Sequence, residues 1–351
     1  MAAGRRVGNQ IKVASPLSRD HSFSAEESAI ALSVEGRRDR DIRVTILPTT
    51  RGEAAHLRLL AAPEEVLEPG ELGLSEANLS GIKEALRSPQ GLILITGATG
   101  AGKTMTLYSL ASLLDFRGLI AVSVEDPVEY DLPYVRQVQA DPVHGLSMQA
   151  ALKSLLRMDP DIVLVGEIRD ASSAVTAVRA AAAGRFVLAT MHARDVPLAV
   201  AECRHFSVPS HLLAATLRVA VSQTLVRRVC AQCREERNPT RAEAEVFDRE
   251  GIDLPNAVSE AVGCEFCHGY GYAGRTGVFE VVRFDRTLRE AVSQGLEAER
   301  LRDAFRDRGH ATLRAAALEK AAAGETTMEE VKNLRYPLPD GNGERGEDAE
   351  P

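Results

Sequence analysis

The chain has 351 residues, of which 44% are hydrophobic and 26% charged, with a formal net charge of −8 and no Trp. This length and composition predict a globular protein with two or three domains. An acidic chain without Trp argues against a nucleic-acid channel, which usually needs a basic groove and stacking aromatic side chains. No apolar run is long enough to span a membrane and the first residues lack the apolar core of a leader, so we expect neither an anchor nor an export signal.

The N-terminal part gives a weak structural signal. Residues 1–40 are polar, of mixed charge and nearly aperiodic, which predicts a mobile segment. The sequence DIRVTILPTTRGEAAHLRLL at 41–60 predicts two strands joined by a Pro/Gly turn. A linker and a capped helix follow, up to residue 88.

From residue 89 to residue 225 apolar strands alternate with amphipathic helices, which predicts an α/β core with a parallel sheet covered on both faces. The expected strands lie at 92–96, 119–124, 162–165 and 186–190. Residues 226–285 look loop-like and contain cysteines, and 286–336 look helical. The acidic, turn-rich residues 337–351 predict a disordered tail.

A phosphate-binding loop follows the first core strand. Eight residues fit the pattern G-x-x-x-x-G-K-[ST] without a gap, between a predicted buried strand and a predicted helix. Its glycines let backbone N–H groups turn toward an anion, and the helix N-terminus adds a positive dipole end. Lys103 would reach the β- and γ-phosphates of a nucleotide, and the Thr104 hydroxyl would bind Mg²⁺. The expected nucleotide-binding residues are Gly97, Ala98, Thr99, Gly100, Ala101, Gly102, Lys103 and Thr104.

Carboxylates follow two further core strands. The strand in AVSVEDPVEY ends in Glu125 and Asp126, with Glu129 one turn later. Such groups can orient an attacking water or hold Mg²⁺, although an acidic solvent-exposed turn would give the same pattern. In DIVLVGEIRD an apolar strand delivers Glu167 to the same sheet edge, as a Walker B carboxylate that reaches Mg²⁺ through its water shell.

Two basic residues accompany these carboxylates. Arg169 is either a phosphate sensor or a structural partner of Asp170. His192 follows a third strand that ends at this edge, which favours a γ-phosphate sensor over the structural role that a lone histidine more often has.

The chain contains five cysteines, four of them in two Cys-x-x-Cys pairs separated by 30 residues. Two such pairs suit tetrahedral Zn²⁺, and the glycines after the second pair permit backbone N–H groups to reach the sulfurs. The alternatives are a redox-active cysteine pair, or Cys-x-x-Cys loops that no longer bind a metal. We expect Cys203 to be a small buried residue, and the zinc ligands to be Cys230, Cys233, Cys264 and Cys267.

Five segments in this order resemble the type II secretion and type IV pilus assembly ATPases, of the extension type: GATGAGKT, VEDPVEY, LLRMDPDIVLVGEIRD, ATMHARD and CAQC…CEFCHGYGYAGRTGVFEV. The resemblance covers about residues 41–335. It implies a RecA-like core at 89–225, a truncated N-terminal α/β domain with its linker at 41–88, and zinc and helical modules after the core.

The resemblance also implies an activity and partners. These relatives hydrolyse ATP as cytoplasmic homohexameric rings, peripheral at the inner membrane. The ring turns against a polytopic platform protein, is held there by a recruiting partner, and drives pilin-like subunits into a filament; no nucleic acid is expected. The cofactors would be ATP, Mg²⁺ and Zn²⁺.

The resemblance assigns roles to residues of this chain. The general base would be Glu129 by the family pattern, although Glu125 lies closer to the strand end. Arg43 and Arg58 resemble arginines that reach the nucleotide when the ring closes and neutralise transition-state charge. The full expected catalytic set is Glu125, Glu129, Glu167, His192, Arg43, Arg58 and Arg157.

The chain departs from the family pattern at Lys153, where Arg is usual, and at Ala193 and Arg194 after the histidine. A nucleotide-binding scaffold with little turnover is therefore one alternative, and a nucleic-acid translocase is another. The strands at 41–60 also lack upstream family elements. We therefore expect them to be weakly held until a neighbouring subunit covers them, and ring assembly to depend on nucleotide and concentration.

Overall fold

The computed structural model describes residues 2–15, 25–34, 37–50, 52–59 and 66–334. The chain divides into two compact units, 1–66 and 67–351. We describe each unit by itself.

The first unit is a helix on a three-stranded antiparallel sheet. Its elements are α1 (Ala2–Ala14), β1 (Glu26–Val34), β2 (Arg37–Thr49) and β3 (Gly52–Leu59), with β2 in the centre. Alternation along the strands places Ile30, Ile42, Val44 and Ile46 on one face, where Ile11 of α1 packs against them.

The helix and the first strand correct the sequence prediction. Residues 1–40 are not without regular structure, and the sheet has three strands instead of two. The error has a physical reason, because Ile30 is the one β1 side chain in the buried cluster among those that the structure describes, and the flanks of β1 are charged. Whether this segment is mobile stays a prediction.

The second unit is built on a seven-stranded sheet in the order β12-β9-β4-β8-β7-β5-β6. All neighbouring strands are parallel except the antiparallel pair β9–β12. This confirms the predicted α/β class with a mostly parallel sheet. The strands are β4 (Gly91–Thr96), β5 (Ala121–Glu125), β6 (Val135–Gln139), β7 (Ile162–Ile168), β8 (Phe186–Met191), β9 (Leu217–Val229) and β12 (Tyr272–Arg283).

The central strands are buried along their whole length, since every residue of β4, β5 and β8 is buried. A strand with this continuous burial must be covered on both faces, which explains its apolar run. The helices around the sheet and on its flanks are α2 (Glu76–Leu86), α3 (Lys103–Ala111), α4 (Met148–Leu156), α5 (Ala171–Ala182), α6 (Val196–His205), α7 (Ser210–Thr216), α9 (Arg286–Ser293) and α10 (Ala298–Arg306), with a 3-10 turn at Pro142–His144.

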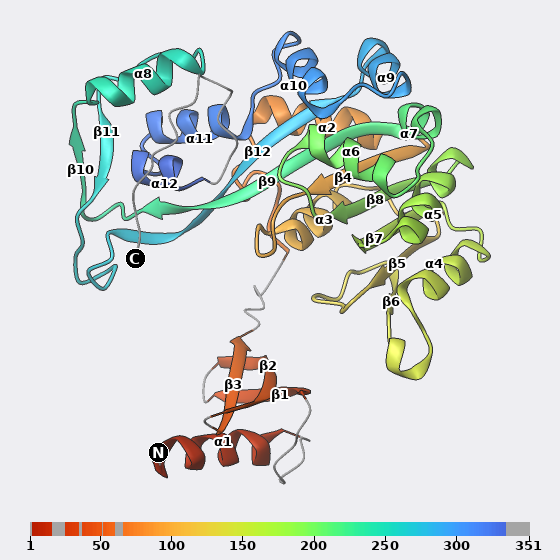
Figure 1. Ribbon diagram of the computed structural model, residues 1–351, viewed down its shortest axis with the longest axis horizontal. Helices are drawn as coiled ribbons and strands as arrows, with labels where there is room; N and C mark the ends of the chain where they lie inside the picture. The colour runs from red at the N-terminus through yellow and green to blue at the C-terminus, as the bar shows by residue number, and fades with distance from the viewer. Residues whose placement is uncertain (1, 16–24, 35–36, 51, 60–65, 335–351) are drawn as a thin grey trace. The chain divides into compact units, whose positions relative to one another are not determined.

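A second apolar cluster includes residues of β9 and β12. There Val226 and Val278 pack with Phe247 and Leu318. The remaining elements of the second unit are β10 (Arg234–Arg237), α8 (Arg241–Arg249), β11 (Val258–Ala261), α11 (Leu313–Ala322) and α12 (Met328–Asn333), with β10 and β11 paired as a small antiparallel sheet. Figure 1 shows α8, α11 and α12 beside the end of β9 and β12.

This arrangement corrects the predicted segment 226–285, which is not loop-like. β9 runs across the predicted boundary at residue 225, and β12 belongs to the main sheet. The helical segment 286–336 is also divided: residues of α9 and α10 pack in the main core, whereas those of α11 and α12 pack in the second cluster. The predicted tail at 337–351 lies outside the described residues.

Among the described residues, no helix combines the length and the apolar character needed to cross a membrane.

Candidate active site and cysteine cluster

The glycine-rich loop lies between the buried strand β4 and helix α3, as its sequence predicts. Three of its glycines have positive φ: 154° at Gly97, 77° at Gly100 and 87° at Gly102. At Gly97 a Cβ would lie 2.4 Å from the carbonyl oxygen of Gln223. Only glycine fits there, because both the backbone conformation and the close approach of β9 exclude a side chain.

Lys103 begins α3 and turns its ammonium back over this loop. Its Nζ donates to the carbonyl oxygens of Gly97 at 2.9 Å and Ala98 at 3.2 Å. It also lies 3.2 Å from Nδ1 of His192 and 3.8 Å from Oε1 of Glu167. Burial lowers the pKa of Lys103, and Glu167 opposes that shift.

Glu167 is directed into the site by a bulge in β7. Val165 pairs with Ala189 and Ile168 with Met191, so two residues of β7 face Thr190 alone. The Thr190 hydroxyl donates to the carbonyl oxygen of Gly166 at 2.5 Å. The structure thus brings Glu167 and His192 together with the loop at the carboxyl edge of the sheet.

Arg169 lies on the outer side of this group. Its guanidinium donates to Glu167, and its Nη1 donates to Asp126 at 2.9 Å. Asp170 instead caps α5 by accepting from the backbone N–H of Ser173 at 2.7 Å. The interpretation of Arg169 as a partner of Asp170 was therefore wrong, while its role as a phosphate sensor stays a prediction.

Glu125 and Glu129 have different environments. The carboxylate of Glu125 is 1% exposed and accepts from the Tyr108 hydroxyl, from Ser123 at 2.6 Å and from Gln137 at 3.0 Å. Burial and this contact with Glu125 raise the pKa of Tyr108. Glu129 is exposed to solvent, and its backbone N–H donates to the same tyrosine hydroxyl at 3.4 Å.

The remaining predicted catalytic residues lie elsewhere in the chain. Arg43 and Arg58 belong to the first unit, where they are directly opposed on β2 and β3 and so share one face of that sheet. Arg157 ends α4, is exposed and donates to the Ser154 hydroxyl at 3.0 Å. Thr104 is half-buried in the first turn of α3.

Two residues beside the loop escaped the sequence analysis. Tyr108 joins α3 to the acidic segment through the contacts given above. Gln223 of β9 accepts from the Thr106 hydroxyl at 2.6 Å, and its carbonyl abuts Gly97. No clear signal for Gln223 was present in the sequence, since its neighbours Ser222 and Thr224 on β9 are polar as well.

The four paired cysteines meet in one cluster whose sulfurs all lie within 4.8 Å of one another. The Sγ–Sγ distances are 3.9 Å from Cys230 to Cys264, 3.7 Å from Cys233 to Cys267 and 3.7 Å from Cys264 to Cys267. Four thiolates around a tetrahedral Zn²⁺ would be about 3.8 Å apart, given the usual zinc–sulfur bond. The donor set and its spacing therefore fit zinc.

Backbone N–H groups support these sulfurs. Gly263 donates to Cys233 at 3.3 Å, and Cys264 and Gly271 donate to Cys267 at 3.1 and 3.2 Å. Burial disfavours the thiolate of Cys267, but these donors outweigh it and lower the pKa of that thiol. Cys203 is 1% exposed in α6, and burial raises its pKa to about 12, as expected for a small buried residue.

Comparison with known proteins shows the family. The family model described as "Type II/IV secretion system protein" matches residues 2–333. The type IV pilus assembly ATPase PilB of Thermus thermophilus is 38% identical over 301 residues, which is 85% of this chain and 34% of that protein. The type II secretion system protein HxcR of Pseudomonas aeruginosa is 37% identical over 323 residues, 92% of this chain and 65% of that protein.

Solved structures share the fold. The ATPase DotB of Legionella pneumophila superimposes with a TM-score of 0.61 at 18% identity, covering 88% of this chain and 77% of that one. The pilus retraction motor PilT with bound ADP also gives 0.61, at 21% identity, covering 89% and 78%. This chain spans between a third and two thirds of the length of these two curated relatives. The match over nearly its whole length shows that the chain belongs to the type II/IV secretion system protein family.

Proposed function

We propose that this chain is an ATP-hydrolysing motor subunit that powers assembly of pilin-like filaments or type II protein secretion. The observation that carries the proposal is the contact of Lys103 with both His192 and Glu167 beside the glycine-rich loop. This places a cation, a carboxylate and an imidazole where the three parallel strands β4, β7 and β8 end. The family supplies the context, since the PilB relative is named an ATPase.

The residues of the loop would bind the triphosphate. Backbone N–H groups of residues 97–104 turn toward the phosphates, and Lys103 neutralises charge on the β- and γ-phosphates. The Lys103 ammonium is already held by two loop carbonyls, so little reorganisation is needed to present it. Thr104 and Glu167 would hold Mg²⁺, which supplies further neutralisation of the phosphate oxygens.

Glu129 is the better candidate for the general base. It is exposed, whereas the carboxylate of Glu125 is buried and already accepts three hydrogen bonds. In the proposed reaction Glu129 takes a proton from water, the water oxygen bonds to the γ-phosphorus, and the bond from that phosphorus to ADP breaks. His192 would sense the γ-phosphate, since its two ring nitrogens already contact Lys103 and Glu167.

The assembly would be a homohexamer with RecA-like cores. Arg43 and Arg58 share a sheet face, so the two guanidinium groups could act on one nucleotide in the assembled ring. We propose that Arg157 also approaches the nucleotide in the assembled ring. We propose that the ring works at the cytoplasmic face of the inner membrane, on a polytopic platform protein with its recruiting partner, and acts indirectly on pilin-like subunits.

Zinc would be held by the four clustered cysteines. Bound there, it would join the end of β9 to the loop before β12 and brace the small sheet β10–β11. Its role would be structural, because four thiolates leave no open coordination position.

Hydrolysis by the purified full chain tests the proposal. Lys103→Ala is expected to lower turnover by at least roughly 100-fold, because the phosphate charge loses its cation. Lys83→Ala, an exposed lysine of α2, serves as the matched control and is expected to keep wild-type turnover. Equal turnover in Lys103→Ala protein would overturn the proposal, and ATP binding without hydrolysis by the wild type would indicate a scaffold instead.

A further inference from the structure

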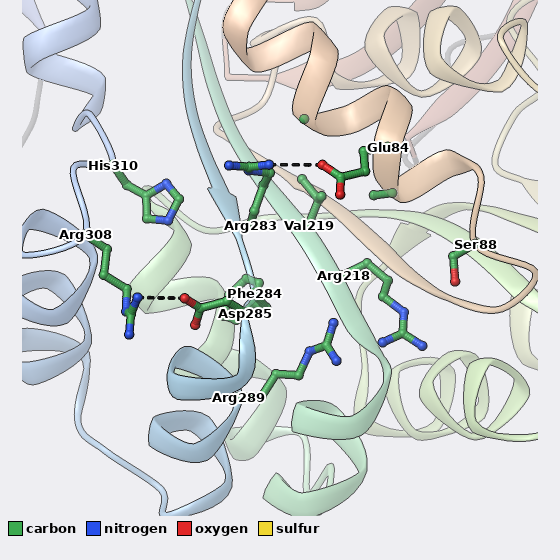
Figure 2. A pocket seen from close by; sticks show the side chains of 12 residues that line it. Glu84, Ser88, Arg218, Val219, Arg283, Phe284, Asp285, Arg289, Arg308 and His310 are labelled. Carbon is green, nitrogen blue, oxygen red and sulfur yellow. Dashed lines mark hydrogen bonds and ion pairs between the residues drawn. The ribbon is translucent and has the colours of Figure 1, made fainter.

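A cleft of about 620 Å³ lies in the second unit, at the end of the sheet opposite the glycine-rich loop. Arg218 of β9 lies in its wall, one residue after Leu217, the partner of Leu92 at the start of β4. The loop follows the other end of β4. Figure 2 shows the cleft between α2, the ends of β9 and β12, α9 and the segment before α11.

Positive charge dominates this cleft, which four arginines and two carboxylates line. Two of the arginines are paired within it: Arg283 with Glu84 at 3.2 Å and Arg308 with Asp285 at 2.7 Å. The other two arginines of the cleft, Arg218 and Arg289, form no ion pair with its two carboxylates.

Arg218 and Arg289 direct their guanidinium groups toward the same space, as Figure 2 shows. Arg218 donates through Nε to the carbonyl of Gln90 at 3.2 Å, and no ion pair to a described residue neutralises it. The Nε of Arg289 is buried and has no hydrogen-bond partner among the described residues. Burial and the nearby Arg218 lower the pKa of Arg289, and Asp285 opposes this shift without outweighing it.

The backbone makes room for these side chains. At Gly91 a Cβ would lie 2.5 Å from Cγ of Arg218, and at Gly81 a Cβ would lie 2.7 Å from Cδ of Arg283. Larger residues at these two positions would displace Arg218 and Arg283, respectively. Two arginines facing each other, one with a buried donor left unsatisfied, cost stability unless an anion completes the site.

We propose that this cleft binds a phosphorylated ligand whose phosphate group bridges Arg218 and Arg289. A phosphate dianion matches the excess of two positive charges, and its oxygens accept from two guanidinium forks at once. A single carboxylate would neutralise one arginine and leave the other exposed to repulsion. The Ser88 hydroxyl and His310 also line the cleft and supply further polar contacts.

The site is separate from the one proposed for ATP and does not depend on hydrolysis. Its ligand can be a soluble phosphorylated molecule or the headgroup of an anionic lipid, since both offer the same phosphate chemistry. The two sources differ in whether binding requires a membrane surface.

Calorimetric titration with pyrophosphate tests the proposal on the full chain, with the nucleotide site first saturated by Mg·ADP. We expect one further binding event, weakened by roughly tenfold or more in Arg218→Gln and in Arg289→Gln, because each change removes a charge-assisted contact. Arg286→Gln is the matched control, since it lies on the same helix with its side chain 93% exposed. The proposal would be overturned if the wild type showed no saturable binding of pyrophosphate. It would also be overturned if Arg218→Gln and Arg289→Gln bound pyrophosphate as tightly as the Arg286→Gln control.

Thermal melting distinguishes a variant that no longer binds pyrophosphate from one that no longer folds. Arg289→Gln is expected to melt no lower than the wild type without ligand, because it removes a repulsion, and to lose the rise in Tm that pyrophosphate gives the wild type. An equal rise in the variant contradicts the assignment.

Vesicles identify the source of the phosphate. Flotation with phosphatidylcholine vesicles, with and without phosphatidylglycerol, is compared for the wild type and Arg289→Gln. Association that needs phosphatidylglycerol and Arg289 and is displaced by pyrophosphate assigns the headgroup; its absence, with pyrophosphate binding retained, assigns a soluble ligand. If a hexaglutamate peptide displaces pyrophosphate at lower concentration than inorganic phosphate does, an acidic protein segment is the ligand and the proposal is wrong.

Discussion

The Nε2 atom of His192 lies 2.7 Å from Oε1 of Glu167. With Nδ1 of the same ring facing the Lys103 ammonium, which can only donate, the proton of a neutral imidazole belongs on Nε2. In that neutral form the histidine donates to the Glu167 carboxylate and accepts from the lysine, while Nδ1 also lies 3.3 Å from the carbonyl oxygen of Gly97.

His192→Ala is expected to lower kcat by roughly 100-fold while KM for ATP changes little, because the loop that binds the phosphates is left intact. His211→Ala is the control, since His211 is an exposed residue of α7. Steady-state ATPase kinetics give both constants. A change confined to KM would show that His192 serves binding and not the chemical step.

Glu125 and Glu129 are distinguished by paired substitutions. Glu129→Gln is expected to lower kcat by roughly 100-fold or more with little change in Tm, because the side chain is exposed and the amide lacks the basicity of the carboxylate. Glu125→Gln is expected to lower the free energy of unfolding by about 1–3 kcal/mol, because the buried amide cannot accept every hydrogen bond that the carboxylate does. Urea unfolding and ATPase rates measured on both proteins check this. A larger loss of kcat in a stable Glu125→Gln protein would reverse the assignment.

Zinc is expected at about one ion per chain in freshly prepared reduced protein. Chelation is expected to raise amide exchange first in residues 230–271, because β12 beyond them is held by the main sheet. Cys264→Ser should lose the metal, whereas Cys203→Ala should keep it. Elemental analysis gives the stoichiometry, and its failure to detect zinc in the wild type would contradict the assignment.

The pH dependence of stability has an identifiable source in Glu243. Its carboxylate is 2% exposed and receives two hydrogen bonds from Arg237, at 2.7 and 2.9 Å. Arg237 lowers the pKa of Glu243 from 4.5 to about 2, against the effect of burial. A lowered folded-state pKa stabilises the fold above pH 4.5, and this contribution is lost as the pH falls from 4.5 toward 2.

Glu243→Gln is therefore expected to cost about 2 kcal/mol at pH 7 and to reduce the slope of stability against pH below 4.5. Glu245→Gln on the same helix is the control, because Glu245 is 62% exposed and pairs with Arg241 at the surface. Urea unfolding between pH 2.5 and 7 measures both. Parallel pH curves for Glu243→Gln and the wild type would sink the idea.

In dilute protein, we expect the backbone amides of β2, the central strand of the first unit, to exchange slowly with solvent. β2 is paired on both edges, and Lys12 of α1 ties the helix to Glu53 of β3 at 2.6 Å. Slow exchange is predicted for Val44 and Ile46, with faster exchange in β1. Rapid exchange throughout β2 would show that the unit needs a neighbouring subunit, as the sequence suggested.

The sequence predicted the core because its signals are local. GLILIT followed by GATGAGKT specifies a strand, a loop and a helix within 20 residues, and the four expected core strands all form. Thr190 and Gly166 could not be read in the same way, because the bulge that directs Glu167 depends on the register between two strands. β12 was missed for a similar reason, since its glycines and charged residues look loop-like until β9 pairs with it.

Contacts between residues far apart in the chain could not be predicted from the sequence either. The pairing of Arg169 with Asp126 crosses 43 positions, and that of Gln223 with Thr106 crosses 117. The N-terminal helix and strand could not be predicted, because charged residues flank them and, among the described side chains, the buried cluster of this sheet is small.

The single strand β9 joins a residue that touches the glycine-rich loop to the residue that precedes the first cysteine pair. Gln223 touches the loop, and Val229 precedes Cys230. Unbroken ladder pairing with β12 from Val219 to Arg227 stiffens the strand between them. Val229 lies six positions after Gln223, a distance of about 20 Å at the usual rise of an extended strand. A tilt of roughly 5° at the loop end would therefore swing the cysteine end by about 2 Å, at the same strand rise. Any small tilt of β9 beside the glycine-rich loop would thus be enlarged beside the cysteines.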